Sequence, residues 1–286
     1  MDRRGDAFGA AVSAASREAP PGARPVAEAV WRADGARAAE RVLPVEIPVA
    51  LVHDATATAV MMATPLDLED FGLGFSLTEG LIDGPGRIRR MEVVEGEAGV
   101  EVRMWLDAGS TAALATRRRR LAGPTGCGLC GIDSLAEAVR APKPVAADLR
   151  LDPADVGRAL ESLRRAQSLN AATRAVHAAG YWTPGEGLVV CREDVGRHNA
   201  LDKVAGALAR RGPVPPGAIV LTSRVSVEMV QKAAAIGAPA IIAVSAPTTL
   251  AVETAERAGL TLIAIARDDG FEVFTRPERV TERPAR

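Results

Sequence analysis

Two cysteines separated by two residues form the most distinctive short motif in this sequence. Cys127 and Cys130 lie in a glycine-rich stretch, and Cys191 is the third cysteine of the 286 residues. Three cysteines cannot close a complete set of disulfides, and the Cys-x-x-Cys spacing is typical of redox, metal or thiol chemistry instead. The cysteine usage therefore predicts a reducing compartment, the cytoplasm.

Three chemistries are compatible with this pair. A zinc site needs about four ligands, whereas the other candidates are Cys191 and three scattered histidines. A thioredoxin-like dithiol is expected after an early strand, but this pair follows a Gly-Pro-Thr-Gly stretch in mid-chain. The third chemistry is an exposed loop whose thiolate accepts sulfur from a donor persulfide and releases it to an acceptor. Gly126, Gly128 and Gly131 favour a loop that can move between partners.

A second group of reactive side chains contains Asp194, Arg197 and His198. It lies between a predicted strand and a predicted helix. A single histidine is more often structural than catalytic, but the charged neighbours and the strand-to-helix position favour a binding site. Asp202 and Lys203, just beyond, are equally compatible with a solvated ion pair on a helix.

Polar residues also follow three further predicted strands. They are Ser223 and Arg224 after the first strand, Thr248 and Thr249 after the second, and Arg267, Asp268, Asp269 and Gly270 after the third. Ligands of open α/β sheets bind outside the carboxyl ends of the strands. Three of the four strand ends lead into helices, whose N-termini present N–H groups and a positive dipole end suited to phosphate. This pattern predicts a phosphorylated or nucleotide ligand, and the alternative for each Ser, Thr or Asp is a helix N-cap.

The elements that position these residues form an alternating series in the C-terminal part of the chain. Apolar runs over 188–191, 218–221, 240–244 and 260–265 alternate with helical periods over 199–211, 225–236 and 250–258. A βαβ series of this kind predicts an α/β fold with a central sheet covered by helices on both faces.

The N-terminal part is predicted to be richer in strands. Four β-rich runs cover 45–52, 58–62, 88–94 and 100–106. Thr64 and Pro65 are typical of the N-cap and first turn of a helix that ends near Gly80. A further amphipathic helix begins near Pro153.

Four segments follow from these patterns. They are a mostly disordered lead-in (1–40), an N-terminal α+β subdomain (41–125), the Cys-x-x-Cys loop with a helical segment (126–180), and a C-terminal βαβ part of the same sheet (181–286). The lead-in is expected to be disordered because it is rich in Ala, Arg, Pro and Gly without a sustained period.

The composition argues against nucleic-acid and membrane partners. Aromatic residues make up 3% of the chain, and 35 basic residues stand against 36 acidic ones. Both stacking platforms and a basic footprint for nucleic acid are therefore lacking. No stretch approaches the ~18 consecutive apolar residues of a membrane-spanning helix.

An ordered set of segments from about Val42 to Pro277 resembles the formate dehydrogenase accessory sulfurtransferases, the FdhD family. The segments are 61–65, 74–80, 127–131, 193–203, 222–224, 228–232 and 244–252. A Cys-x-x-Cys motif alone is a weak signal, whereas this ordered set is highly specific.

The resemblance implies a cytoplasmic sulfurtransferase. Such a protein takes sulfur from a cysteine desulfurase and delivers it to the molybdenum or tungsten cofactor, bis-molybdopterin guanine dinucleotide, before insertion into the formate dehydrogenase catalytic subunit. Cys127 would be the persulfide carrier and Cys130 a second thiol that assists transfer. The resemblance also implies a homodimer with a cytidine-deaminase-like fold, and we expect no dedicated metal. A chaperone that delivers the cofactor without sulfur transfer and a zinc-stabilised structural module are the alternatives.

The family's cofactor-binding stretch aligns near the C-terminus. The aligned residues are Ile265, Ala266, Arg267, Asp268, Asp269 and Gly270. The family commonly ends this stretch with a basic residue, whereas here Arg267 is the only nearby cation. The resemblance places the guanine-dinucleotide phosphates on the strand-end surface, next to Asp194, Arg197, His198, Ser223, Arg224, Thr248 and Thr249.

Overall fold

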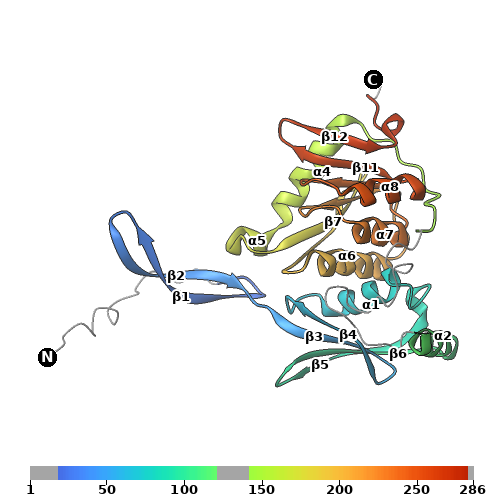
Figure 1. Cartoon of the computed structure of the whole chain (residues 1–286), viewed down its shortest axis with the longest axis horizontal. Coiled ribbons are helices and arrows are strands. Elements are labelled where there is room, and N and C mark those ends of the chain that lie inside the picture. The colour runs from blue at the N-terminus through green and yellow to red at the C-terminus, as the bar shows by residue number, and fades with distance from the viewer. Residues whose placement is uncertain (1–18, 121–141, 283–286) are drawn as a thin grey trace.

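Three sheets organise the described part of the chain, residues 19–120 and 142–282 of a computed structural model (Figure 1). They contain two, four and six strands, and helices pack against the two larger sheets. The α/β class expected from the sequence is confirmed. The division into domains and the cytidine-deaminase-like relationship stay predictions, and the Cys-x-x-Cys loop lies outside the described residues.

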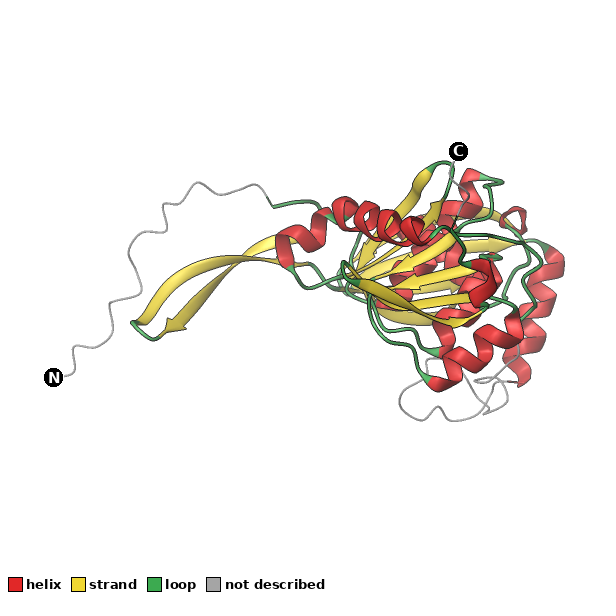
Figure 2. Cartoon of the chain, turned by 90° about the horizontal axis from the view of Figure 1, so that it is seen from above, coloured by secondary structure: helices red, strands yellow, loops and turns green. Residues whose placement is uncertain are grey.

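A hairpin that projects from the rest of the chain forms the two-stranded sheet (Figure 2). Its strands are β1 (Ala23–Arg32) and β2 (Gly35–Pro44), paired antiparallel over their whole length. The expected disordered lead-in is therefore wrong for residues 23–40. The Asp34–Gly35 dipeptide is a hairpin turn signal, and the many alanines conceal the alternation of the strands.

The four-stranded sheet confirms the four β-rich runs of the N-terminal part. Its strands, in the order β4-β3-β6-β5, are β3 (Ile47–His53), β4 (Thr56–Ala63), β5 (Ile88–Gly96) and β6 (Gly99–Leu106). The helix α1 (Leu68–Thr78) covers one face, where Phe71 is fully buried against Leu51 and Val102. The short helix η1 (Pro85–Arg87) precedes β5, and α2 (Ala108–Arg120) follows β6.

The predicted start of α1 is wrong. The helix begins at Leu68, after Asp67 in a left-handed conformation, and not at the Thr64–Pro65 pair. The Thr64 hydroxyl accepts a hydrogen bond from the Val195 N–H at 3.2 Å. A long-range contact therefore replaces the expected helix cap.

The six-stranded sheet has the order β12-β11-β10-β9-β7-β8. Its strands are β7 (His177–Thr183), β8 (Gly187–Asp194), β9 (Ala218–Leu221), β10 (Ala240–Ala243), β11 (Thr261–Arg267) and β12 (Gly270–Thr275). β9, β10 and β11 are parallel, but β7 lies antiparallel between β8 and β9. The predicted βαβ series is interrupted there. Since β8 still runs in the direction of β9, the carboxyl ends of β8, β9, β10 and β11 share one edge.

Helices cover both faces of this sheet, as predicted. The helices described after residue 142 are α4 (Pro153–Ala166), α5 (Ser168–Thr173), α6 (Arg197–Arg211), α7 (Val227–Ile236), α8 (Thr249–Ala258) and the short η2 (Pro277–Arg279). α6, α7 and α8 pack on one face, and α4 packs on the other. No helix in the described ranges is long and apolar enough to cross a membrane.

A close crossing of α1 and α6 joins the two larger sheets (Figure 1). A Cβ atom on Gly74 would lie 1.7 Å from the Asp202 carbonyl oxygen, and one on Gly206 would lie 1.9 Å from the Asp70 carbonyl oxygen. Only glycine allows the two backbones to approach this closely. The crossing brings the start of α1 next to the end of β8.

Candidate functional site

The loops that follow β9 and β10 are hydrogen-bonded to each other, and the loop after β10 is also bonded to β11. The Val225 N–H donates to the Ala246 carbonyl oxygen (3.2 Å), and the Thr248 N–H donates to the Val225 carbonyl oxygen (3.0 Å). The Ile265 N–H donates to the Ser245 carbonyl oxygen at 3.3 Å. The structure therefore brings these two loops and the C-terminal part of β11 together at the edge that the sequence predicted.

The predicted site residues divide between the two sides of this edge. Those at the starts of α6, α7 and α8 are Asp194, Arg197, His198, Ser223, Arg224, Thr248 and Thr249, whereas Ala266 belongs to the core beneath α4. Thr248 has the alternative role, because its hydroxyl caps α8 by accepting from the Ala251 N–H at 3.2 Å. The starts of α6 and α7 have no side-chain cap.

A cavity of about 320 Å³ opens on the α4 side of the edge. It is lined by Leu160, Leu163, Arg164, Gln167, Thr222, Val244, Ala266, Arg267 and Asp268. This volume is at the lower end of the range for small-molecule sites, and an apolar wall with a few charged groups is typical of them. Arg164 Nη2 donates to Asp268 Oδ1 at 2.9 Å, so the Asp268 charge is paired and Arg267 can face an anion. The sequence did not indicate Arg164, which comes from a helix more than a hundred residues earlier.

Ile265 has a backbone conformation that β-branched residues rarely adopt. Its φ is 51°, in the left-handed region. The pairing of β11 with β12 shifts register between Ala264 and Arg267, at the same place. Strained backbone of this kind clusters at binding and catalytic sites. The irregularity directs the chain into the cavity wall at Ala266 and Arg267.

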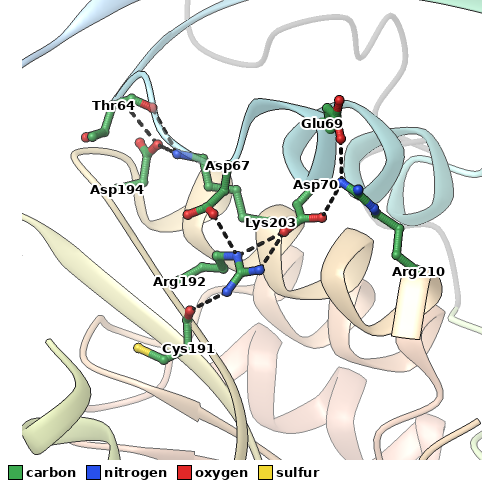
Figure 3. Close-up of polar contacts among 9 residues, drawn as sticks. All are labelled: Thr64, Asp67, Glu69, Asp70, Cys191, Arg192, Asp194, Lys203 and Arg210. Carbon is green, nitrogen blue, oxygen red and sulfur yellow. Dashed lines mark hydrogen bonds and ion pairs between the residues drawn. The ribbon is translucent and has the colours of Figure 1, made fainter. Parts of the chain in front are cut away.

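The Asp194 carboxylate is fully buried and accepts four hydrogen bonds. The donors are the backbone N–H groups of Thr64 (3.1 Å) and Gly196 (2.8 Å), Asn199 Nδ2 (2.9 Å) and Lys203 Nζ (2.6 Å). Figure 3 shows Thr64, Asp194 and Lys203 meeting between the two sheets. Because these four donors occupy both carboxylate oxygens, Asp194 positions the turn before α6 and does not face a ligand.

Asp202 and Lys203 are both fully buried, so their interpretation as a solvated ion pair is wrong. Asp202 Oδ1 accepts from Lys232 Nζ (2.8 Å) and from the Thr78 hydroxyl (2.6 Å). Lys203 Nζ also donates to the Thr64 carbonyl oxygen at 2.9 Å. Burial lowers the pKa of Lys203, an effect that the Asp194 carboxylate opposes. The two neighbours in sequence thus serve two separate buried networks.

Arg197, the first residue of α6, carries a guanidinium N–H donor that is not used in the described structure. Its Nε atom is buried and has no hydrogen-bond partner among the described residues. Burial, followed by the charges of Arg197 and Lys232, lowers the pKa of His198 to about 4. Burial and Arg197 also lower the pKa of His177. At neutral pH both imidazoles are uncharged, and Arg197 supplies the positive charge.

A surface network beside this site holds α1 against β8 and α6 (Figure 3). Arg192 Nη2 donates to Asp70 Oδ2 at 2.7 Å, and Arg210 Nη1 donates to Asp70 Oδ1 at 3.2 Å. Cys191, the residue before Arg192, is partly buried. Burial, with the nearby Glu193 charge, raises the pKa of its thiol to about 12. Cys191 is therefore a packed, protonated thiol and not a nucleophile at neutral pH.

The predicted carriers Cys127 and Cys130 lie outside the described residues. The described chain stops at Arg120 of α2 and resumes at Pro142. Pro142 and Lys143 line a second cleft, of about 980 Å³, next to the last residues of α6 and α7. In the described ranges no group of three His, Cys, Asp or Glu side chains is placed to hold a metal ion.

A sheet with polar loops, uncapped helix starts and a small cavity at one edge defines an α/β protein with a candidate ligand site, whose unpaired N–H groups and arginines suit anionic groups. Comparison with known proteins specifies the family. Residues 44–281 match the FdhD/NarQ family model, and the chain belongs to this family.

Similar proteins from several bacteria carry the same name. The "Sulfur carrier protein FdhD" of Agrobacterium fabrum strain C58 is 49% identical over 259 residues, which cover 90% of this chain and 96% of the relative. The protein of that name from Brucella abortus is 47% identical over 261 residues, 91% of this chain and 97% of the relative. A crystal structure from Desulfotalea psychrophila, provisionally described as a formate dehydrogenase accessory protein, has a TM-score of 0.73 and 29% identity, covering 91% of this chain and all of the other. A role in sulfur transfer for formate dehydrogenase maturation follows at this general level.

Proposed function

We propose that this protein is a sulfurtransferase that carries sulfur from a cysteine desulfurase to bis-molybdopterin guanine dinucleotide, a cofactor of molybdenum or tungsten. The observation that carries the proposal is the similarity to proteins named sulfur carriers, which are 49% and 47% identical over 90% and 91% of this chain. The strand-end surface supports it, because a guanine dinucleotide brings phosphates to helix starts and to unpaired arginine groups.

In the proposed reaction the Cys127 thiolate attacks the outer sulfur of a desulfurase persulfide. The donor S–S bond breaks, and the donor cysteine leaves as a thiolate. Attack by Cys130 on the inner sulfur of the Cys127 persulfide then releases sulfide for the cofactor and forms a Cys127–Cys130 disulfide. A cellular dithiol must reduce this disulfide before the next cycle.

The cofactor is the substrate in this proposal, and the described residues bind it. Arg267 and the Ala266 backbone would contact one phosphate-bearing part from the cavity. The Arg197 Nε atom and the uncapped start of α6 would contact another. Asp268 is paired with Arg164 on the surface, which partly offsets the repulsion between its carboxylate and a phosphate.

The wider setting of the proposal is a cytoplasmic homodimer that serves the catalytic subunit of formate dehydrogenase. The relatives' names and the similarity to the Desulfotalea protein support the general role. The cytidine-deaminase-like relationship of the fold belongs to the same proposal.

Complementation tests the carrier role. In a strain that lacks its own copy of this gene, Cys127→Ala is expected to abolish formate dehydrogenase activity. Cys130→Ala is expected to lower it less, because a cellular thiol can attack the Cys127 persulfide in place of Cys130 and release the sulfide. Cys191→Ala is the matched control, because its thiol is packed and protonated. Full rescue by Cys127→Ala would contradict the proposal.

Mass spectrometry separates sulfur transfer from cofactor delivery alone. After incubation with a desulfurase and cysteine, the wild type should gain ~32 Da, one sulfur atom, on the peptide that contains Cys127. A chaperone that never handles sulfur would show no such gain. A zinc-stabilised module would instead contain about one zinc per chain by metal analysis.

A further inference from the structure

The β1–β2 hairpin, which we call the arm, has one apolar face. Partners in an antiparallel pair point to the same side of the sheet, and the pairing places Trp31 opposite Ala36 and Pro25 opposite Val42. The positions between them on this face are alanines, apart from Glu40, the one charged residue of the face. We call this the apolar arm face.

The opposite face of the arm is charged. Arg37 pairs with Val30, and Arg41 pairs with Val26, on the side that also carries Arg24 and Arg32. The two faces of one ribbon therefore differ in the kind of surface they can contact: charged groups suit solvent, whereas the apolar arm face suits burial.

The rest of the described chain leaves the arm largely uncovered. Trp31, near its tip, is 79% exposed. The ribbon extends away from the two larger sheets, and α5 lies against β2 at its base (Figure 2). A free two-stranded ribbon is marginally stable in water, and a continuous exposed apolar surface marks an interaction site. Beyond its base, the arm thus lacks a packing partner within the described ranges.

A second apolar surface lies at the base of the arm. Pro48 and Ala50 of β3 pair with Met62 and Val60 of β4, so the four side chains share one face. This face is opposite the one that α1 covers, and Val60 and Met62 are 56% and 49% exposed. We call these four residues the body patch.

The arm cannot cover the body patch of its own chain. β2 ends at Pro44 and β3 begins at Ile47, so only Val45 and Glu46 connect the arm to the strand that carries half of the patch. Two residues are too short to fold a ten-residue ribbon back over the next strand. A second copy of the chain has both an arm and a patch, so a symmetric exchange satisfies both at once.

We propose that the arm of each protomer packs its apolar face on the body patch of a second copy of this chain. Ten residues span ~34 Å, and a two-stranded ribbon is about 10 Å wide, so one arm face offers on the order of 300 Å². Each protomer gives an arm and receives one, which approaches the ~800 Å² per partner of a stable interface. The inference deepens the homodimer of the proposed function and is independent of the sulfur chemistry.

Sedimentation velocity of the full chain at micromolar concentration tests this interface. The wild type is expected to be a dimer, and Trp31→Glu and Met62→Glu are each expected to weaken self-association about 100-fold or more, because they place a charge in a buried contact. Arg37→Glu, on the charged arm face, is the matched control and should leave the dimer intact. Circular dichroism and thermal melting show whether the sheets of each variant stay folded.

Mixing the variants gives the sharper test. Trp31→Glu keeps its body patch and Met62→Glu keeps its arm, so the two together should form a heterodimer through one intact contact. A wild-type monomer would overturn both the dimer and the arm exchange, whereas a dimer that ignores both substitutions would overturn the arm exchange alone. The complementation assay with Cys127→Ala tests the proposed function separately, because it measures formate dehydrogenase activity and not self-association.

Discussion

Lys203 Nζ lies 2.6 Å from Asp194 Oδ2, with both side chains fully buried. The two residues also hold the backbone of Thr64 from both sides, since Asp194 accepts from its N–H and Lys203 donates to its carbonyl oxygen. The ion pair therefore ties the end of β4 to the turn that presents Arg197 at the start of α6. The join between the two larger sheets and the geometry of the candidate site depend on the same contact.

Replacing Lys203 with methionine should destabilise the protein strongly. The change leaves the Asp194 carboxylate buried without its cation, and removing one partner of a buried pair costs about 3–5 kcal/mol. Urea denaturation followed by circular dichroism measures the free energy of unfolding. Asp194→Asn combined with Lys203→Met should cost less than the sum of the two single changes.

A surface ion pair provides the control for this prediction. Arg165 Nε lies 2.7 Å from Glu161 Oε1, and the arginine side chain is 79% exposed. Arg165→Met should change the free energy of unfolding by less than about 1 kcal/mol. Equal effects of Lys203→Met and Arg165→Met would show that burial of the Asp194 pair does not set its energy.

Gly74→Ala tests the crossing of α1 and α6. The new methyl group would lie 1.7 Å from the Asp202 carbonyl oxygen, so the helices must separate. We expect a loss of about 3 kcal/mol or more, at the upper end for overpacking. Gly157→Ala is the matched control, because its Cβ meets nothing within 4 Å in α4, and it should stabilise by about 0.5–1 kcal/mol. Thermal melting of both variants decides whether the crossing requires glycine.

The local elements were largely predictable from the sequence because they depend on periodicity. β9 occupies the predicted range 218–221, and α6, α7 and α8 begin within two residues of their expected starts. β7 was missed because the sequence of His177–Thr183 has small residues and Gly180 in place of a clear alternation. A strand without that pattern gains its stability from its neighbours in the sheet.

The roles of the charged residues were less predictable, because their partners are remote in sequence. Asp194 contacts Thr64, 130 residues earlier, and no local spacing indicates such a pair. Asp202 and Lys203 are adjacent in sequence and were expected to form a solvated ion pair with each other, yet each is buried with a different partner. The grouping of the strand-end loops was predictable, since it follows from strand direction alone.

His198 should stay neutral down to acidic pH. Burial, with the charges of Arg197 and Lys232, lowers its pKa to about 4, against about 6.5 in the unfolded chain. An NMR titration of the imidazole measures this value directly. The chain has three histidines, so comparison with His198→Gln identifies the signal. A pKa near 6.5 would contradict the buried, positively charged surroundings.

The same shift predicts how stability depends on pH. Between pH 6.5 and about 4 the unfolded chain binds a proton at His198 that the folded chain does not, so folding becomes less favourable as pH falls. The contribution is fully present above pH 6.5 and amounts to at most roughly 3 kcal/mol. Denaturation curves of the wild type and His198→Gln should therefore converge or cross as pH falls through this window. Parallel curves would show that His198 does not contribute.

The Cys191 thiol should resist alkylation in the folded protein. Its pKa is raised to about 12, so almost no thiolate is present at pH 8. In a Cys127→Ala, Cys130→Ala variant, iodoacetamide at pH 8 should leave Cys191 unmodified until urea unfolds the chain. Mass spectrometry of the native and unfolded samples makes the comparison. Rapid modification of the native sample would show that Cys191 is reactive, and it would then be a candidate persulfide carrier beside Cys127.

Guanosine diphosphate should bind the strand-end surface, because it carries the base and phosphates of the proposed substrate. Arg197→Ala and Arg267→Ala each remove a cation and are expected to lower the affinity about 10-fold, since a hydrogen bond to a charged group contributes about 1.5–3 kcal/mol. Arg165→Ala, on the exposed side of α4, is the control. Calorimetric titration at low and high salt should show weaker binding at high salt for the wild type. If both site variants keep the wild-type affinity and melting temperature, the nucleotide does not bind at this edge of the sheet.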